Sequence, residues 1–129
     1  MTTILLAEDD LDDQELFADA LTEIDPSIHL LTFSSGKKIL KHLQNLENDQ
    51  IPEMIVLDYN IPEINGAEIL KKLEEDHRYD PMVKVVWSTS NSPTYQNSCL
   101  QLGAKAYFVK PSNIVALNEM VKQIISFLN

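Results

Sequence analysis

The sequence has little of several features that define whole classes of protein. It contains a single cysteine, Cys99, so no internal disulfide can form. It has 10 basic and 20 acidic side chains without a basic run, and its net charge of −10 repels phosphate backbones, which argues against nucleic-acid binding. No stretch approaches the roughly 20 apolar residues of a membrane-spanning helix, and the N-terminus lacks the pattern of a signal peptide. We therefore expect a cytoplasmic protein that binds neither membranes nor nucleic acids.

Length and composition indicate one globular domain. The chain has 129 residues, of which 44% are apolar and 23% charged, and this balance is typical of a folded protein rather than a disordered one. A chain of this size can bury one core but is short for two. Because no repeat, linker or low-complexity stretch interrupts the pattern, we expect a single domain over residues 1–129 without an attached output domain.

Short apolar runs alternate with segments of helical period along the chain. Several runs are continuously apolar, which is typical of strands covered on both faces in a parallel sheet. The candidate strands are residues 4–7, 29–33, 54–58, 83–88 and 106–109. Five strand and helix pairs in succession predict an α/β fold, a doubly wound five-stranded parallel sheet with helices on both faces.

The candidate helices carry apolar residues at spacings of three and four. The clearest stripes are Leu16, Phe17, Ala20, Leu21 and Ile24, and later Ile114, Leu117, Val121, Ile124 and Leu128. A weaker helix near residues 93–102 has no charged residue, and we expect Tyr95, Cys99 and Leu102 on its inner face. Candidate N-caps are Ser34 or Ser35 for one helix and Ser112 or Asn113 for the last.

Polar residues stand where the candidate strands end. In doubly wound sheets the functional crevice lies beyond the carboxyl ends of the strands, at the point where the strand order reverses. Glu8 and Asp9 follow the first strand, Asp58 ends the third, Ser88 ends the fourth and Lys110 follows the fifth. These side chains are therefore expected to meet at one edge of the sheet.

The expected cluster has a chemistry of its own. Converging carboxylates repel one another, so a cation is expected among them, and oxygen ligands without histidine or cysteine favour Mg²⁺. Mg²⁺ commonly shares its coordination sphere with a phosphate, which points to phosphoryl transfer. Asp58 would be the nucleophile, Lys110 would neutralise charge on the transferring oxygens, and the Ser88 hydroxyl would hold another oxygen. The expected product is an aspartyl phosphate.

Other conspicuous residues have structural interpretations. Asp10, Asp12 and Asp13 are acids of the kind favoured at a helix N-terminus by the macrodipole. Trp87 precedes Ser88 in a candidate strand and is expected to pack in the core.

Four motifs give the chain a family resemblance. They are ILLAEDD at residues 4–10, DYNIP at 58–62 leading to Asn65 and Gly66, STS at 88–90 and the pair Lys110 and Pro111. In order and spacing they resemble a response-regulator receiver domain of two-component signalling, of the stand-alone kind. The resemblance implies the flavodoxin-like receiver topology, and a partner histidine kinase or histidine phosphotransfer protein that supplies phosphate from a phosphohistidine.

The resemblance also implies roles for single residues. Asp58 is similar to the family's phospho-acceptor, and the implied Mg²⁺ ligands are Asp9, Asp58, the backbone carbonyl of Asn60 and, through water, Glu8. Lys110, Ser88, Thr89 and Tyr107 match the residues that contact the phosphate and switch conformation. The implied switch moves the fourth helix, the fifth strand and the fifth helix. The bond between Lys110 and Pro111 resembles the family's cis peptide.

Two other classes share this architecture but fit the residues less well. A haloacid-dehalogenase-like phosphatase also uses a strand-end aspartate and Mg²⁺, but it needs a second aspartate two positions on, where this chain has Asn60. Turnover of external substrates is therefore not expected. A flavodoxin-like electron carrier needs a phosphate-cradling loop after the first strand, and residues 8–10 of this chain are acidic there.

A third alternative is a docking module of the same fold that is never phosphorylated. The intact set of Asp9, Asp58, Ser88 and Lys110 argues against it. The downstream target, the cognate kinase and the oligomeric state are left open by the sequence.

Overall fold

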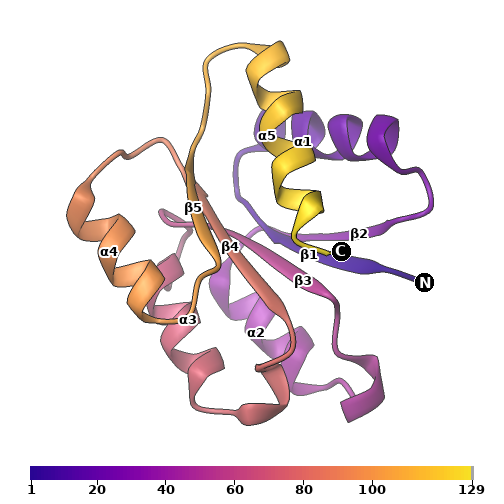
Figure 1. Ribbon diagram of the computed structural model, residues 1–129. Helices are drawn as coiled ribbons and strands as arrows, with labels where there is room; N and C mark the ends of the chain where they lie inside the picture. The colour runs from indigo at the N-terminus through magenta and orange to yellow at the C-terminus, as the bar shows by residue number, and fades with distance from the viewer. Residues whose placement is uncertain (129) are drawn as a thin grey trace.

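The computed structural model describes residues 1–128, in which a five-stranded parallel sheet lies between two layers of helices (Figure 1). The strands are β1 (Thr3–Ala7), β2 (His29–Phe33), β3 (Met54–Asp58), β4 (Val83–Ser88) and β5 (Ala106–Val109). The helices are α1 (Leu11–Ile24), α2 (Gly36–Gln44), α3 (Gly66–Glu74), α4 (Pro93–Gln101) and α5 (Ile114–Ser126), with short 3₁₀ turns at Asn48–Gln50 and His77–Tyr79. The predicted α/β fold is confirmed, and only β1 differs from its predicted bounds, by one residue. The single-domain prediction extends to residue 129, which lies outside the described residues.

The sheet separates two apolar cores. Its order is β2-β1-β3-β4-β5, with α1 and α5 on one face and α2, α3 and α4 on the other (Figure 1). Successive residues of β3 alternate between the cores: Met54 and Val56 pack under α1 and α5, whereas Ile55 and Leu57 pack under the other layer. Both sets are fully buried, which explains why the central strands are continuously apolar. No helix of residues 1–128 is long and apolar enough to cross a membrane.

The helix ends follow the predicted capping pattern. The Ser35 side chain accepts from the Lys38 N–H at the start of α2, and the Asn113 side chain accepts from the Ala116 N–H at the start of α5. These contacts decide between the paired candidates, in favour of Ser35 and Asn113.

The fourth helix differs in part from the expectation. Cys99 is fully buried as predicted, but Tyr95 is 36% exposed, so its predicted inward position is wrong. The Tyr95 ring instead stacks on the Tyr59 ring, with centroids 4.2 Å apart and planes 11° from parallel. An aromatic neighbour outside the helix explains why helical period alone misplaces this side chain.

Burial gives Cys99 a testable chemical property. Because it is removed from water, its thiol has a pKa raised to about 11. Thiol reagents attack the thiolate, so we expect labelling of native protein at pH 8 to be at least about 100-fold slower than labelling in denaturing urea. The chain has one cysteine, and a mass-spectrometric time course therefore follows this site alone. Equal rates in the two conditions would contradict the burial of this side chain.

Candidate functional site

The sheet brings the functional candidates to the carboxyl ends of its strands. β1 and β3 pair in parallel register, so Glu8 and Asp9 leave β1 beside the end of β3, where Asp58 stands. On the other side, the Lys110 N–H donates to the Ser88 carbonyl at 2.7 Å and aligns the end of β5 with the end of β4. The order reverses between β1 and β3, and that switch point is where the crevice was expected.

Three carboxylates form the centre of the site. Oxygen atoms of Glu8, Asp9 and Asp58 lie within 4.8 Å of one another. Glu8 is fully buried and Asp58 is nearly so, whereas Asp9 is exposed. A set of hard oxygen donors, open to solvent on the side of Asp9, fits a divalent cation such as Mg²⁺ that keeps part of its water shell. The oxygen donors of these three residues therefore fit a Mg²⁺ site of the kind that the sequence predicts.

The Lys110 ammonium bridges the carboxylates. Its Nζ lies 2.7 Å from Glu8 Oε1, 3.0 Å from Asp13 Oδ2 and 3.1 Å from Asp58 Oδ2. An ammonium group has three N–H donors, so these three acceptors account for all of them. The lysine side chain is 8% exposed, which limits screening of these ion pairs by water.

Burial and charge shift the ionisation of this cluster. Burial raises the pKa of the Glu8 carboxyl to about 7, although the hydrogen bond from Lys110 acts in the opposite direction. For Lys110, burial would lower the pKa of the ammonium, but the hydrogen bond to Glu8 and the charges of Asp58 and Glu8 outweigh it and raise that pKa above its ordinary value. Lys110 is therefore a permanent cation in the site.

Asp13 has a contact that the sequence did not reveal. As predicted, these acids stand at a helix N-terminus: Asp12 and Asp13 lie in the first turn of α1, and the Asp10 side chain accepts from the Asp13 N–H at 3.0 Å. In addition, the Asp13 carboxylate pairs with Lys110. Because α1 begins only four residues after β1, its first turn lies over the strand ends, and this short connection is the signal that could have identified Asp13.

The Ser88 hydroxyl and the Tyr107 ring both contact the loop after β4. Ser88 is fully buried, and its Oγ accepts from the Ser90 N–H at 3.1 Å. The half-buried Tyr107 donates its hydroxyl to the Ser90 carbonyl at 2.8 Å. Ser90 thus contacts both Ser88 and Tyr107, the two predicted switch residues. Thr89, which lies between Ser88 and Ser90 in the chain, is exposed.

The loop after β3 folds closely over the acceptor aspartate. The Asn60 N–H donates to Asp58 Oδ1 at 3.1 Å and fixes the orientation of that carboxylate. At Gly66 a Cβ atom would stand 3.0 Å from the Tyr59 Cα and 3.2 Å from the Asp58 carbonyl oxygen. A side chain at position 66 would crowd both backbone atoms, which gives a physical reason for Gly66 in the sequence motif.

Comparison with known proteins assigns the family. The model of the response regulator receiver domain family matches residues 4–122. The chain belongs to this family. The phosphorylated cyanobacterial phytochrome response regulator RcpA superposes with a TM-score of 0.89 at 28% identity, over 98% of this chain and 93% of the RcpA chain. The Mn²⁺-bound form of response regulator Rcp1 gives a TM-score of 0.88 at 28% identity, over 98% and 94% of the two chains.

Sequence relatives of this receiver domain differ in length. It is 29% identical over 123 residues to the chemotaxis protein CheV2 of Helicobacter pylori. The aligned region covers 95% of this chain but only 38% of CheV2. It is 28% identical over 122 residues to the two-component response regulator ORR3 of Oryza sativa subsp. japonica, covering 95% and 89%. The chain thus spans less than half of one relative and most of the other.

The peptide bond between Lys110 and Pro111 corrects one expectation. The cis bond implied by the resemblance is wrong for this receiver domain, because every peptide bond described for residues 1–128 is trans. A bond before proline prefers the trans form by about 0.5–1 kcal/mol. Here the Lys110 ammonium reaches its three carboxylates from the trans form, so no contact of the described site requires the cis isomer.

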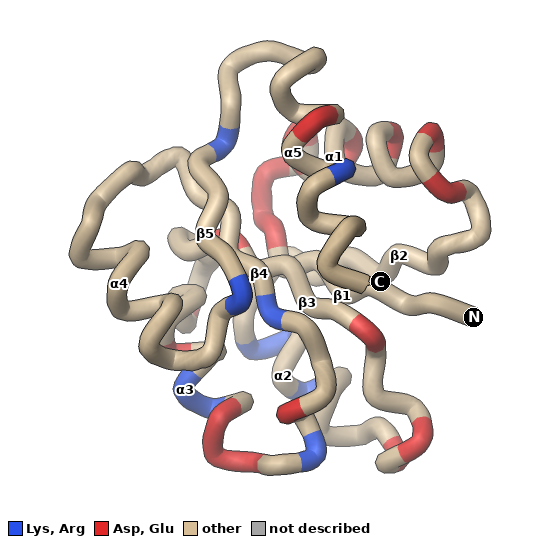
Figure 2. The backbone as a smooth tube through the Cα atoms, in the orientation of Figure 1, with Lys and Arg blue, Asp and Glu red and all other residues tan. Residues whose placement is uncertain are grey.

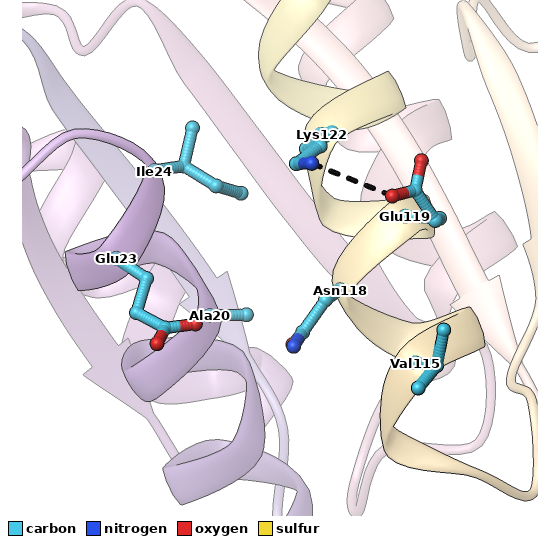
Figure 3. Close-up of a pocket in the computed structure, with 7 residues that line it drawn as sticks. All are labelled: Ala20, Glu23, Ile24, Val115, Asn118, Glu119 and Lys122. Atoms are coloured by element: carbon cyan, nitrogen blue, oxygen red, sulfur yellow. Dashed lines mark hydrogen bonds and ion pairs between the residues drawn. The ribbon is translucent and has the colours of Figure 1, made fainter.

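One hollow of the receiver domain is separate from the acidic cluster. It has a volume of about 650 Å³ and lies between α1 and α5, where Ala20, Glu23 and Ile24 oppose Val115 and Asn118 (Figure 3). None of the three clustered carboxylates lines it. The chemistry of the site therefore depends on the strand ends rather than on this hollow.

Figure 2 shows acidic residues along α1, whereas α4 has no charged residue.

Proposed function

We propose that the protein accepts a phosphoryl group on Asp58 from the phosphohistidine of a histidine kinase or a histidine phosphotransfer protein. The observation that carries the proposal is the placement of Asp58, a nearly buried carboxylate at the end of β3 with Lys110 3.1 Å away and two further acids beside it. RcpA, a close structural neighbour, is a phosphorylated response regulator by its own description.

The proposed cofactor is Mg²⁺. Asp9, Asp58 and the backbone carbonyl of Asn60 are the proposed direct ligands, and Glu8 is proposed to act through water. In support, both Glu8 oxygens already accept hydrogen bonds, Oε1 from Lys110 and Oε2 from the Asp10 N–H. When bound, the metal would neutralise charge on the carboxylates and on the phosphoryl oxygens. Rcp1 is described with Mn²⁺ bound, a cation that prefers similar oxygen ligands.

Asp58, Asn60 and Lys110 have different roles in the proposed phosphoryl transfer. An oxygen of the Asp58 carboxylate forms the new bond to phosphorus as the bond from phosphorus to the donor's histidine nitrogen breaks, and the histidine leaves with the electron pair. The Asn60 N–H holds the other Asp58 oxygen, so the nucleophile is oriented in advance. The Lys110 cation lies close enough to Asp58 to neutralise charge on the oxygens of the phosphoryl group that Asp58 receives.

We propose Ser88, Thr89 and Tyr107 as the residues that report phosphorylation. If the Ser88 hydroxyl turns toward a new phosphate, it must give up its hydrogen bond with Ser90. Tyr107 holds the carbonyl of the same residue, so release of Ser90 would free the ring as well. Such a change would shift the population between two packings of α4, β5 and α5.

We propose a regulator of the cytoplasm that is phosphorylated without turnover of external substrates. Position 60 supports this, because Asn60 cannot act as the general acid or base of a phosphatase. A docking module that is never phosphorylated is not favoured, because it gives no reason for three acids to share one buried lysine.

Intact-mass spectrometry after incubation with acetyl phosphate tests the proposal. We expect one phosphate adduct that requires Mg²⁺ and is absent from Asp58→Asn. Asp49→Asn is the matched control, because Asp49 lies in an exposed 3₁₀ turn and its variant should be labelled like the native chain. An adduct on Asp58→Asn, or no adduct on the native chain with Mg²⁺, would refute the proposed acceptor.

A further inference from the structure

Trp87 lies directly beneath the proposed site. It is the penultimate residue of β4, pairs in register with Asp58 of β3, and is 1% exposed. Its ring belongs to the core under α1 and α5, where it meets the Phe17 ring edge to face, with centroids 5.4 Å apart and an angle of 68°. The indole is therefore held in one orientation by the sheet below and by α1 above.

The face of this ring is in contact with the Lys110 ammonium. The Lys110 Nζ lies 4.6 Å from the centroid of the Trp87 ring, within the range of a cation–π interaction. Tryptophan is the aromatic residue that binds cations most strongly, and both groups are largely removed from water. The ammonium thus contacts both the indole face and the carboxylates of Glu8, Asp13 and Asp58.

The indole N–H of Trp87 makes no polar contact, unlike the ring face. Trp87 Nε1 is the one buried side-chain nitrogen or oxygen without a hydrogen-bond partner among the described residues. An unsatisfied buried donor destabilises a protein, so the N–H does not account for the presence of an indole here. The ring face, which does have a polar partner, is what distinguishes Trp87 from an aliphatic core residue.

We propose that Trp87 is a positioning residue that holds the Lys110 ammonium at the acidic cluster, ready for the phosphoryl group that arrives on Asp58. This inference rests on the proposed function. Lysine has a flexible four-carbon stem, and Lys110 lies in the connection between β5 and α5. The contact with the ring restricts that flexibility, and Trp87 acts on the transfer through Lys110 alone.

A spectroscopic experiment tests the contact itself. Trp87 is the only tryptophan of the chain, so its fluorescence and near-ultraviolet circular dichroism signals belong to one ring. We expect Lys110→Met to change the emission and Lys110→Arg, which keeps a cation, to stay closer to the native spectrum. Lys105→Met is the matched control, because Lys105 precedes β5 as Lys110 follows it, and we expect the native spectrum there. A native spectrum in Lys110→Met would overturn the proposal.

A kinetic experiment tests the consequence for phosphorylation. A cation–π contact is worth about 2- to 30-fold in an equilibrium, so Trp87→Leu is expected to slow labelling by acetyl phosphate and Mg²⁺ within that range. Trp87→Phe keeps an aromatic face and is expected to be slowed clearly less than Trp87→Leu. Both variants lose indole volume, and urea unfolding compares their stabilities. Equal slowing in the two, or rates that follow stability rather than aromaticity, would reduce Trp87 to a packing role.

The two experiments separate this inference from the proposed function. If the native chain is not phosphorylated at all, the proposed function fails, while the emission of the Lys110 variants still decides whether the ring holds the ammonium. If the native chain is phosphorylated and Trp87→Leu is as fast as native, the proposed function stands and the positioning role is wrong.

Discussion

Replacing Lys110 by methionine is expected to lower the free energy of unfolding by about 3 kcal/mol, since removal of one partner from a buried ion pair leaves uncompensated charge. The lysine pairs with three carboxylates at distances of 2.7–3.1 Å, and two of them are buried. Asp13 is 30% exposed and can regain water, so the expected cost is at the low end for such a loss. Urea unfolding without divalent cations measures it.

The same variant is expected to be phosphorylated about 100-fold more slowly, the usual cost of removing one group that stabilises developing charge. Added Mg²⁺ is expected to recover more stability in Lys110→Met than in the native chain, because the carboxylates then lack their own cation. Lys122→Met is the control, since Lys122 forms an exposed pair with Glu119 at 3.4 Å that contributes at most about 1 kcal/mol. A Lys110→Met protein as stable as Lys122→Met would show that the cluster is solvated rather than held by the lysine.

The fold was largely predictable from local sequence because the three central strands, β1, β3 and β4, are covered on both faces. Continuous apolar runs such as residues 54–57 appear only where both neighbouring layers are apolar, and β3 lies between two cores. β2 lies at the sheet edge and is partly exposed, yet its run still matched the strand. Tyr95 could not be placed from helical period, because its partner Tyr59 stands 36 residues earlier in the chain.

The site was predictable where residues lie at strand ends and unpredictable where side chains meet from different layers. Topology alone brings Glu8, Asp9 and Asp58 together, and their oxygens do lie within 4.8 Å. The contacts of Lys110 with Asp13 and with the Trp87 ring depend on side-chain direction and on how α1 crosses the strand ends. The short connection from β1 to α1 was the available sign of that crossing for Asp13, and both residues were interpreted from the sequence as structural.

Truncation of Phe17 to alanine is expected to destabilise the protein by about 3–5 kcal/mol, the usual cost of removing a large aromatic side chain from a core. Phe17 is fully buried on α1 and packs against the Trp87 ring. Its loss leaves a cavity that the sheet below cannot fill, since β strands pair on both sides of Trp87. The midpoint and slope of a urea unfolding curve give the free energy.

Leu11→Ala provides the control for this change, because Leu11 begins the same helix but is 72% exposed and should cost less than about 0.5 kcal/mol. The contrast also bears on the site, since α1 carries Asp13 and covers Trp87. If Phe17→Ala loosens α1, the emission of Trp87 should change with the stability, whereas Leu11→Ala should alter neither. A small loss of stability in Phe17→Ala would mean that α1 settles onto the sheet, and the Asp13 contact with Lys110 would then have to move with it.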